Sequence, residues 1–278
     1  LSVPYALYAE TAGGSNGWAD SAGLLHNTNT TGRVGIGTTN PKARLHVADS
    51  SVVFTGLFDN DYPYGPIYYP WYFYVEEQPL SGPGSRMMWC ADRSAFRAGM
   101  VFGDEWDQSN IGFGSIALGI GAKAHDDMST AIGGLGELSM QGPVAGYRAT
   151  AIGCGATATG WGSTAIGGWQ GFTPLASGFA SVALGVGATA SGLDAFATMS
   201  GTASGHYSIA MRGNATGNSA VAIRGNAAGE GAVAILGNAT GDNAIAIGGV
   251  ATGENAIAIG YSMATGNYSA TLGDMVST

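Results

Sequence analysis

The sequence has few charged side chains and no long hydrophobic run. Lys, Arg, Asp and Glu together make up 10% of its 278 residues, against about 25% in an average globular domain. Only ten residues are Lys or Arg and the net charge is −9, so we expect no nucleic-acid partner, because phosphate binding needs clustered cations. No run of about 18 apolar residues occurs, so we expect no membrane-spanning segment.

Reactive side chains are also sparse. The two cysteines, Cys90 and Cys154, are too few for a disulfide framework. The four histidines are scattered, and the sequence contains no G-x-S-x-G, phosphate-binding loop or H-E-x-x-H motif. We therefore expect the chain not to be an enzyme, and we assign no catalytic residue, cofactor or metal ligand.

Glycine, by contrast, is abundant, with 48 residues, and much of it belongs to an internal repeat. From Ile116 onward, a triplet of the type Ala-Ile-Gly occurs twelve times. Its last residue, here called the anchor, is Gly119, Gly133, Gly153, Gly167, Gly185, Met199, Arg212, Arg224, Leu236, Gly248, Gly260 and Gly273. Successive anchors are 12 to 14 residues apart, except for two intervals of 20 and 18 residues. Such a regular period is typical of a solenoid.

Each repeat predicts two short strands and two turns. The residue two places before the anchor is Ala in eleven of the twelve copies, and the residue one place before is Ile, Leu or Met in eleven. This alternation indicates a strand that is apolar on both faces. Gly- and Asn-rich segments supply the turns because they tolerate positive φ. A coil this short has no room for three sides, so we expect a flat two-sided roll whose interior admits little more than Ala.

The large apolar side chains must then lie outside the roll, where a monomer would expose them as one long stripe. Stripes of this size mark interfaces, and a thin solenoid has little core of its own. Self-association therefore follows from the pattern. The symmetry of the assembly does not.

The repeats resemble the head domains of trimeric autotransporter adhesins. The resemblance is carried by segments such as "SVALGVGATASG" (181–192) and "NAIAIG" (243–248 and 255–260), and it covers roughly 115–278. It implies an all-β, left-handed parallel β-roll with 12–14 residues per coil. It also implies a homotrimer in which three rolls pack around one axis.

The N-terminal part resembles other secreted fibrous proteins. The segment 34–47 is similar to one in phage tail fibres and in surface proteins of Bacteroidota-like bacteria, and 87–99 is similar to the cap before the repeats of the latter. We expect residues 1–32 to form an extension or linker and residues 33–110 a β-rich cap or connector. Residues 111–278 would be the roll, whose first coil has an open edge that a cap must cover.

Six aromatic residues are candidate receptor contacts. Four of them lie in the aromatic segment 61–77, namely Tyr68, Tyr69, Trp71 and Tyr72. Such rings stack on sugars or anchor a protein partner, and the alternative is packing against the roll or a neighbouring subunit. Trp169 and Phe172 lie in the 18-residue interval between anchors. Insertions of this kind form loops that collect on the binding face of a solenoid.

Arg212 and Arg224 are anchors of neighbouring coils, which lie about 4.8 Å apart. Like charges at this spacing repel unless an acid or a bound anion lies between them. Glu230 is a candidate acid, and an anion site is the alternative.

Three asparagines and two acidic clusters have simpler interpretations. Asn214, Asn226 and Asn238 each lie two residues after an anchor, so they should stack as an amide ladder. The clusters at 59–61 and 104–107 lack the spacing of a calcium loop, which favours solvated turns.

Together these features predict an extracellular or cell-surface trimeric fibrous protein that binds a cell-surface, matrix or glycan receptor. One alternative is a tail or receptor-binding fibre of a phage or contractile injection system, on a virion-like particle. The other is the repeating subunit of an extracellular filament, with head-to-tail pairing through Leu1–Glu10. Because the chain begins with Leu1 rather than Met, we also expect a signal peptide or an upstream domain before it.

Overall fold

The computed structural model describes residues 18–21, 24–27, 33–36, 38, 40–48, 52–54, 80–135, 142–169 and 171–273. The chain divides into two compact units, residues 1–55 and 56–278. In the first unit, β1 (Trp18–Ser21) pairs antiparallel with β2 (Leu24–Asn27), and β3 (Val34–Ile36) pairs parallel with β4 (Leu45–Val47).

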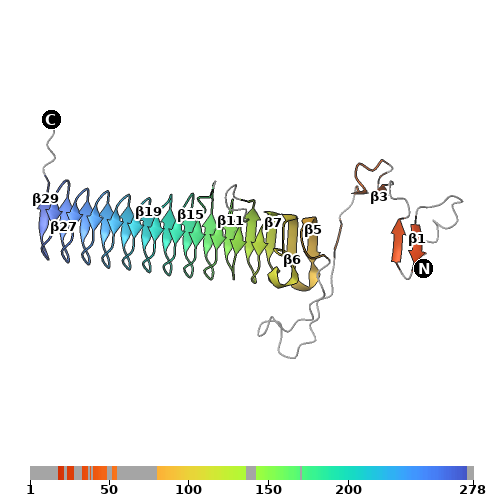
Figure 1. The fold of residues 1–278 in the computed structure, drawn as a ribbon, viewed down its shortest axis with the longest axis horizontal. Coiled ribbons are helices and arrows are strands. Elements are labelled where there is room, and N and C mark those ends of the chain that lie inside the picture. Colours follow the sequence, from red (N-terminus) through yellow and green to blue (C-terminus); the bar gives the residue numbers. More distant parts are fainter. Residues whose placement is uncertain are drawn as a thin grey trace, which may run out of the picture. The chain divides into compact units, whose positions relative to one another are not determined.

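The second unit is a two-sided solenoid, in which each coil adds one strand to each of two sheets (Figure 1). The repeat strands of the larger sheet are β7 (Ile116–Ile120), β9 (Thr130–Gly133), β11 (Thr150–Ile152), β13 (Thr164–Ile166), β15 (Val182–Leu184), β17 (Phe196–Thr198), β19 (Ile209–Met211), β21 (Val221–Ile223), β23 (Val233–Ile235), β25 (Ile245–Ile247), β27 (Ile257–Ile259) and β29 (Ala270–Leu272). The smaller sheet consists of β8 (Lys123–Ala124), β10 (Val144–Ala145), β12 (Thr157–Ala158), β14 (Leu175–Ala176), β16 (Thr189–Ala190), β18 (Thr202–Ala203), β20 (Asn214–Ala215), β22 (Asn226–Ala227), β24 (Asn238–Ala239), β26 (Val250–Ala251) and β28 (Met263–Ala264). The predicted all-β parallel roll with two sides is confirmed.

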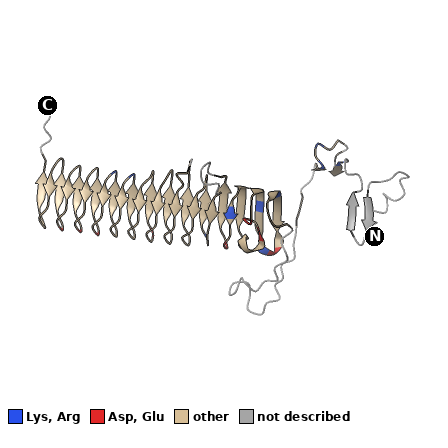
Figure 2. Cartoon of the chain, in the orientation of Figure 1, with Lys and Arg blue, Asp and Glu red and all other residues tan. Residues whose placement is uncertain are grey.

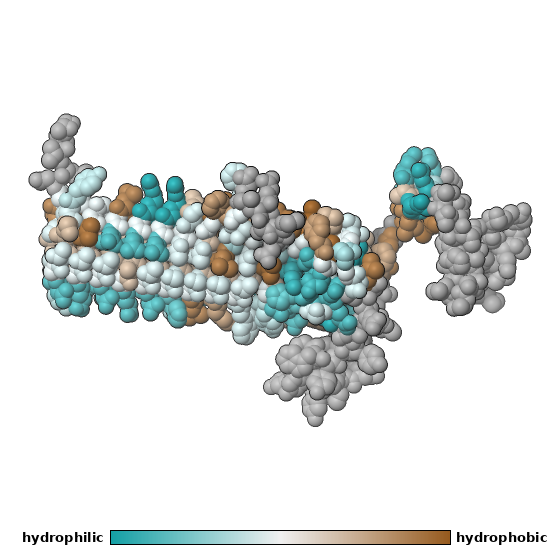
Figure 3. Space-filling model, in the orientation of Figure 1, coloured by the Kyte–Doolittle hydropathy of each residue, from teal (hydrophilic) through white to brown (hydrophobic). Residues whose placement is uncertain are grey.

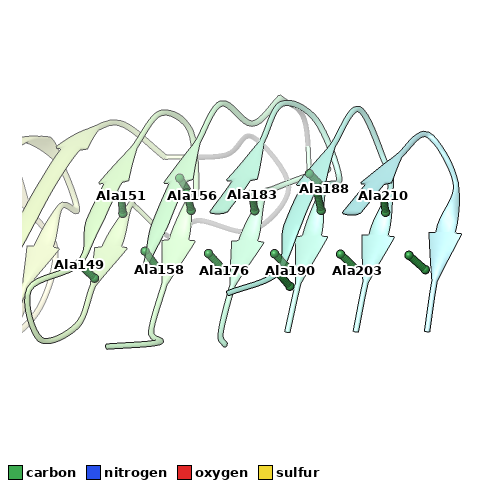
Figure 4. Packing of buried hydrophobic residues seen from close by; sticks show 14 of the residues in the cluster. Ala149, Ala151, Ala156, Ala158, Ala176, Ala183, Ala188, Ala190, Ala203 and Ala210 are labelled. Atoms are coloured by element: carbon green, nitrogen blue, oxygen red, sulfur yellow. The ribbon is translucent and has the colours of Figure 1, made fainter. Parts of the chain in front are cut away.

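The interior of the roll is built from alanine. In the larger sheet Ala183 pairs with Ala197, and in the smaller sheet Ala190 pairs with Ala203. These alanines are fully buried, and their methyl groups meet between the two sheets (Figure 4). Because consecutive strand residues point to opposite faces, the residues on either side of each inner alanine point outward. The prediction of a core with little besides Ala is confirmed.

The two edges of the roll consist of different turns. We call the turns after the larger-sheet strands, which contain the anchors, the anchor edge, and the turns after the smaller-sheet strands the return edge. At the anchor edge, Arg212 and Arg224 both have φ of 53°, which explains why most anchors are Gly. At the return edge, Ala180 and Asp194 have φ of 52° and 51°. The amide of Asp194 donates to the carbonyl oxygen of Phe179 at 2.9 Å, and such bonds tie each turn to the previous one.

A hairpin ahead of the first coil extends the larger sheet, and we call residues 84–110 the cap. β5 (Gly84–Cys90) and β6 (Ala95–Val101) pair antiparallel, and β6 pairs parallel with β7. Two short 3-10 helices, η2 (Ala91–Arg93) and η3 (Gln108–Asn110), belong to the same region. The larger sheet therefore continues past its first coil as ordinary sheet.

The smaller sheet ends at β8, and side chains satisfy its first carbonyl groups. The indole Nε1 of Trp106 donates to the carbonyl oxygen of Ala122 at 2.8 Å, and the guanidinium of Arg97 donates to that of Ala124 at 2.9 Å. Both side chains are fully buried. Burial lowers the pKa of Arg97 to about 10, so it is charged at neutral pH. A buried arginine and a tryptophan thus take the place of a strand.

Candidate functional site

The outer face of the larger sheet is apolar at most positions along the roll, with threonines at Thr130, Thr150, Thr164 and Thr198. One column of outward residues lies one place before the anchor, and Ile166, Ile247 and Ile259 in it are each about two-fifths exposed. A second column, three places before the anchor, includes Ile209 and Ile257, which are exposed to a similar extent. The remaining large apolar members of the two columns are Ile116, Leu118, Ile132, Ile152, Val182, Leu184, Phe196, Met211, Val221, Ile223, Val233, Ile235, Ile245 and Leu272. None of them is buried within the single chain.

The outer face of the smaller sheet is polar over most of its length. The first residue of each strand points outward there, as in Thr157, Thr189 and Thr202. Further along the same column, the side-chain amide of Asn214 donates to Asn226 Oδ1 at 3.2 Å, and that of Asn226 donates to Asn238 Oδ1 at 2.9 Å. The predicted amide ladder is confirmed.

Trp169 and Phe172 lie on the anchor edge, between β13 and β14. The amide of Trp169 donates to the carbonyl oxygen of Phe172 at 3.4 Å, and the reverse bond measures 2.9 Å. These two bonds close a tight hairpin, so the insertion is accommodated outside the strands. The side chains are 63% and 64% exposed in the single chain. Their part in receptor binding stays a prediction.

Arg212 and Arg224 occupy successive turns of the anchor edge, because β19 and β21 pair in register. Both side chains are exposed, and neither forms an ion pair with another described residue. Glu230 lies in a return-edge turn, between β22 and β23. The hypothesis that Glu230 separates the two arginines within one chain is therefore wrong, because the two strand ends of a coil lie on opposite edges.

An aromatic cluster on the return edge was not predicted from the sequence. Tyr147, Trp161 and Phe179 come from three consecutive turns, with ring centroids 5.3 and 5.4 Å apart in edge-to-face geometry. Trp161 and Phe179 are each 50% exposed, and the guanidinium of Arg148 lies 5.3 Å from the Tyr147 ring centroid. Each of the three precedes the positive-φ residue of its turn. An alignment on the return turns, rather than on the anchors, would have found this column.

The same column becomes acidic toward the C-terminal end of the roll. Glu230, Asp242 and Glu254 occupy it in three successive turns. Asp242 Oδ1 accepts a hydrogen bond from the amide of Glu230 at 3.0 Å. In Figure 3 the lower edge of the roll changes from brown to teal toward this end. Figure 2 shows that charged residues are otherwise few along the roll and gather in the cap.

The other predicted candidates have simple outcomes. Tyr68, Tyr69, Trp71 and Tyr72, like the acidic cluster 59–61, lie outside the described residues, so their roles stay predictions. In the cluster 104–107, Asp107 Oδ1 accepts the amide of Gly82 at 2.7 Å, a bond that orders a turn. The described residues contain no group of three His, Cys, Asp or Glu able to hold a metal ion.

The two thiols are free, and Cys154 lies on the anchor edge directly after the anchor Gly153. Cys90 is buried in the cap, and burial raises the pKa of its thiol. The Cys154 thiol donates to the carbonyl oxygen of Leu135 at 2.7 Å. Within the part of the chain that the structure describes, no helix is long and apolar enough to cross a bilayer.

Comparison with known families identifies the repeat. The family model described as "YadA head domain repeat (2 copies)" matches five segments of the chain, namely residues 111–135, 145–168, 176–198, 238–249 and 251–270. No curated protein matches the chain. The YadA head is a structural adhesin family rather than an enzyme family, is exposed outside the cell, and implies homotrimer formation. The repeat region is therefore similar to the YadA head and forms a head-domain β-roll of the kind found in trimeric autotransporter adhesins, with an adhesin-like role in general.

Proposed function

We propose that this chain is the head of an extracellular trimeric fibre, which binds a cell-surface, matrix or glycan receptor. The observation that carries the proposal is the contrast between the outer faces of the two sheets. One face has Ile, Leu, Val, Met or Phe at most of its outward positions, whereas the other has Thr or Asn at the first position of six of its eleven strands. A surface with the first composition is stable only when covered, whereas the second is stable in water.

Three copies cover the apolar faces most simply if each roll turns its larger sheet toward a common axis. The side chains of Ile245 and Ile257, which are register partners in β25 and β27, would then lie in the centre of the trimer. The smaller sheets would all face solvent. This arrangement gives the fibre a hydrophobic core that a single roll lacks, because the interior of one roll is only alanine.

Two kinds of surface stay available for a receptor in such a trimer. The first is the outer face of the smaller sheet, which presents the threonines and the amide ladder. The second is provided by the insertions around 134–146 and 168–174 and by the aromatic segment 61–77, where specificity can be added without disturbing the coils. Trp169 and Phe172 are candidates for receptor contact, and packing against a neighbouring subunit is their competing role.

The trimer is tested by placing carboxylates on one face and then on the other. The double substitution Ile245→Asp with Ile257→Asp is expected to give monomers in light scattering, because unpaired buried carboxylates cost several kcal/mol each. The matched control is Thr189→Asp with Thr202→Asp, which puts two carboxylates on register partners of the smaller sheet. We expect this control to stay trimeric. A wild-type protein that is a folded monomer at micromolar concentration would contradict the proposal.

The receptor is tested with the intact trimer on glycan and extracellular-matrix arrays. Deleting 168–174 or shortening 134–146 should abolish binding while leaving the trimer intact, if these loops carry specificity. Binding that persists after both changes would assign recognition to the smaller-sheet face or to the aromatic segment instead.

A further inference from the structure

The two edges of the roll change character at the same height. Each strand of the larger sheet begins at a return-edge turn and ends at an anchor-edge turn, so it defines a level. We describe a level by the residue before the positive-φ position of its return turn and by the largest side chain of its anchor turn, which is the anchor or one of the two residues after it. The level of β13 has Trp161 on the return edge and Trp169 on the anchor edge. The next two levels pair Phe179 with Val186 and Leu193 with Met199. Over these levels both edges carry large apolar side chains.

Beyond β17 the next two levels are polar on both edges, although Tyr207 beside His206 is 58% exposed, and the return edge then stays polar as far as Tyr268. The levels of β19 and β21 pair His206 with Arg212 and Asn218 with Arg224. The next two levels place Glu230 and Asp242 on the return edge, opposite Leu236 and Gly248. Leu236 and the distant Tyr261 are the large apolar exceptions on the anchor edge. Within one chain the two edges lie on opposite sides of the roll, so contact inside the chain does not explain why they change together.

We propose that the anchor edge of one subunit packs against the return edge of the next subunit, level by level, at the three corners of the trimer. The inference rests on the burial of the larger-sheet faces proposed above. Three slabs with their apolar faces toward one axis form a triangular prism. Rotation about that axis brings unlike edges together, since cyclic interfaces of order three are head-to-tail. It also preserves height when the rolls run along the axis, so equal levels meet.

The exposure of the apolar residues supports this assignment. Trp161, Phe179, Trp169, Phe172 and Met199 are all half exposed or more in the single chain. Between two subunits, these side chains would cover one another. The rings of Tyr147, Trp161 and Phe179 stand edge to face, with interplanar angles of 82° and 72°. The rings therefore form ridges between which side chains of another subunit can pack. They do not form the coplanar surface on which a sugar would stack.

The arginine pair gains a counter-charge in the same arrangement. Arg212 and Arg224 have no ion-pair partner among the described residues of their own chain. At the corner, Arg224 faces the neighbour's return edge at the level of Asn218, and Glu230 follows one coil further, about 4.8 Å away. An arginine side chain spans that distance. The acid closest to Arg224 thus comes from another subunit, on the acidic part of its return edge, and Arg212 lies one coil further from it.

Disulfide trapping tests the contact directly. In a Cys154→Ser background, we would combine Phe179→Cys with Val186→Cys, which lie on opposite edges at the level of β15. The backbone runs extended from Ser181 to Gly185, so at about 3.3 Å per residue the two edges are more than about 10 Å apart. A disulfide needs Cα atoms within about 7 Å, so one chain cannot close this bond. Oxidation should give covalent dimers and trimers on a denaturing, non-reducing gel.

Two controls test whether cross-linking requires residues at the same level and on unlike edges. Phe179→Cys combined with Arg224→Cys separates the thiols by three coils, about 14 Å along the axis, and should give no cross-link. Each single cysteine variant should also stay uncross-linked, because three-fold packing never brings two copies of the same edge together. Cross-linking of a single variant, or of the mismatched pair alone, would overturn the inference.

Light scattering on the same samples separates this inference from the proposed function. Trimers that do not cross-link at matched levels would overturn the corner contact and leave the trimeric head in place. Monomers would overturn both. A thermal cycle with Trp161→Ala, Trp169→Ala and the double variant adds a second readout. If the double variant loses less melting temperature than the sum of the two single variants, the two tryptophans contact each other across the corner. Additive losses, together with loss of receptor binding, would indicate that Trp169 contacts the receptor instead.

Discussion

The two sheets of the roll share one interior and differ in the side chains on their outer faces. Both have an inward column of alanine and the same stacking of coils. The larger sheet adds Ile, Leu and Val outside, and the smaller sheet adds mostly Thr and Asn. The inward alanines and the turns therefore determine the shape of the coil, and the outward columns determine how the rolls assemble. Either outward column can therefore change without changing the fold.

The two sheets also end differently at the cap, and the largest effect on stability is expected there. Trp106→Ala removes a fully buried side chain and the indole donor to the Ala122 carbonyl oxygen. We expect the free energy of unfolding to fall by about 3–5 kcal/mol, measured by chemical denaturation. The effect should begin in the smaller sheet, so hydrogen exchange should speed up at β8 before β7.

The control for this prediction is Trp89→Ala in β5, whose side chain is 44% exposed. It removes a similar volume from the strand side of the cap. If Trp89→Ala lowers the free energy of unfolding as much as Trp106→Ala does, the two sheets are capped equally, and the difference between their ends does not affect stability.

The shared interior gives the next effect. Ala222 in β21 is fully buried between the sheets, and Ala222→Leu adds three carbons where only a methyl group fits. Overpacking of this kind costs about 1–3 kcal/mol and occasionally more, which a lowered midpoint of chemical unfolding would report. The outward substitution Thr189→Leu, on the smaller-sheet face that stays in solvent, should leave the midpoint nearly unchanged, because that side chain has room. Equal losses from both changes would mean that inner and outer positions do not differ.

The strands and interior could be predicted because their signal repeats in residue type. Ala recurs at the inward position of every repeat strand of the larger sheet, β7 to β29, except β29, which has Thr271, and an Ile, Leu or Met follows it in most. The return-edge column has no such signal, because Trp161, Phe179 and Glu230 share only a position in a turn. Arg97 was also missed, since its partners are backbone carbonyl groups that only the folded cap brings together. Three-fold symmetry came from the resemblance alone.

The amide ladder gives the smallest effect and tests the polar face. Asn226 accepts a hydrogen bond from Asn214 and donates one to Asn238, so Asn226→Ala removes both. Each such bond contributes about 1 kcal/mol at most when its groups are partly solvated, and water can replace part of that. We expect a loss of about 1 kcal/mol in unfolding free energy and no change in trimer formation, because the ladder lies on the face that stays in solvent. Thr202 lies in the same column and forms no such bond, so Thr202→Ala serves as the reference. A change of oligomeric state in Asn226→Ala would place the smaller sheet, and not the larger one, at the subunit interface.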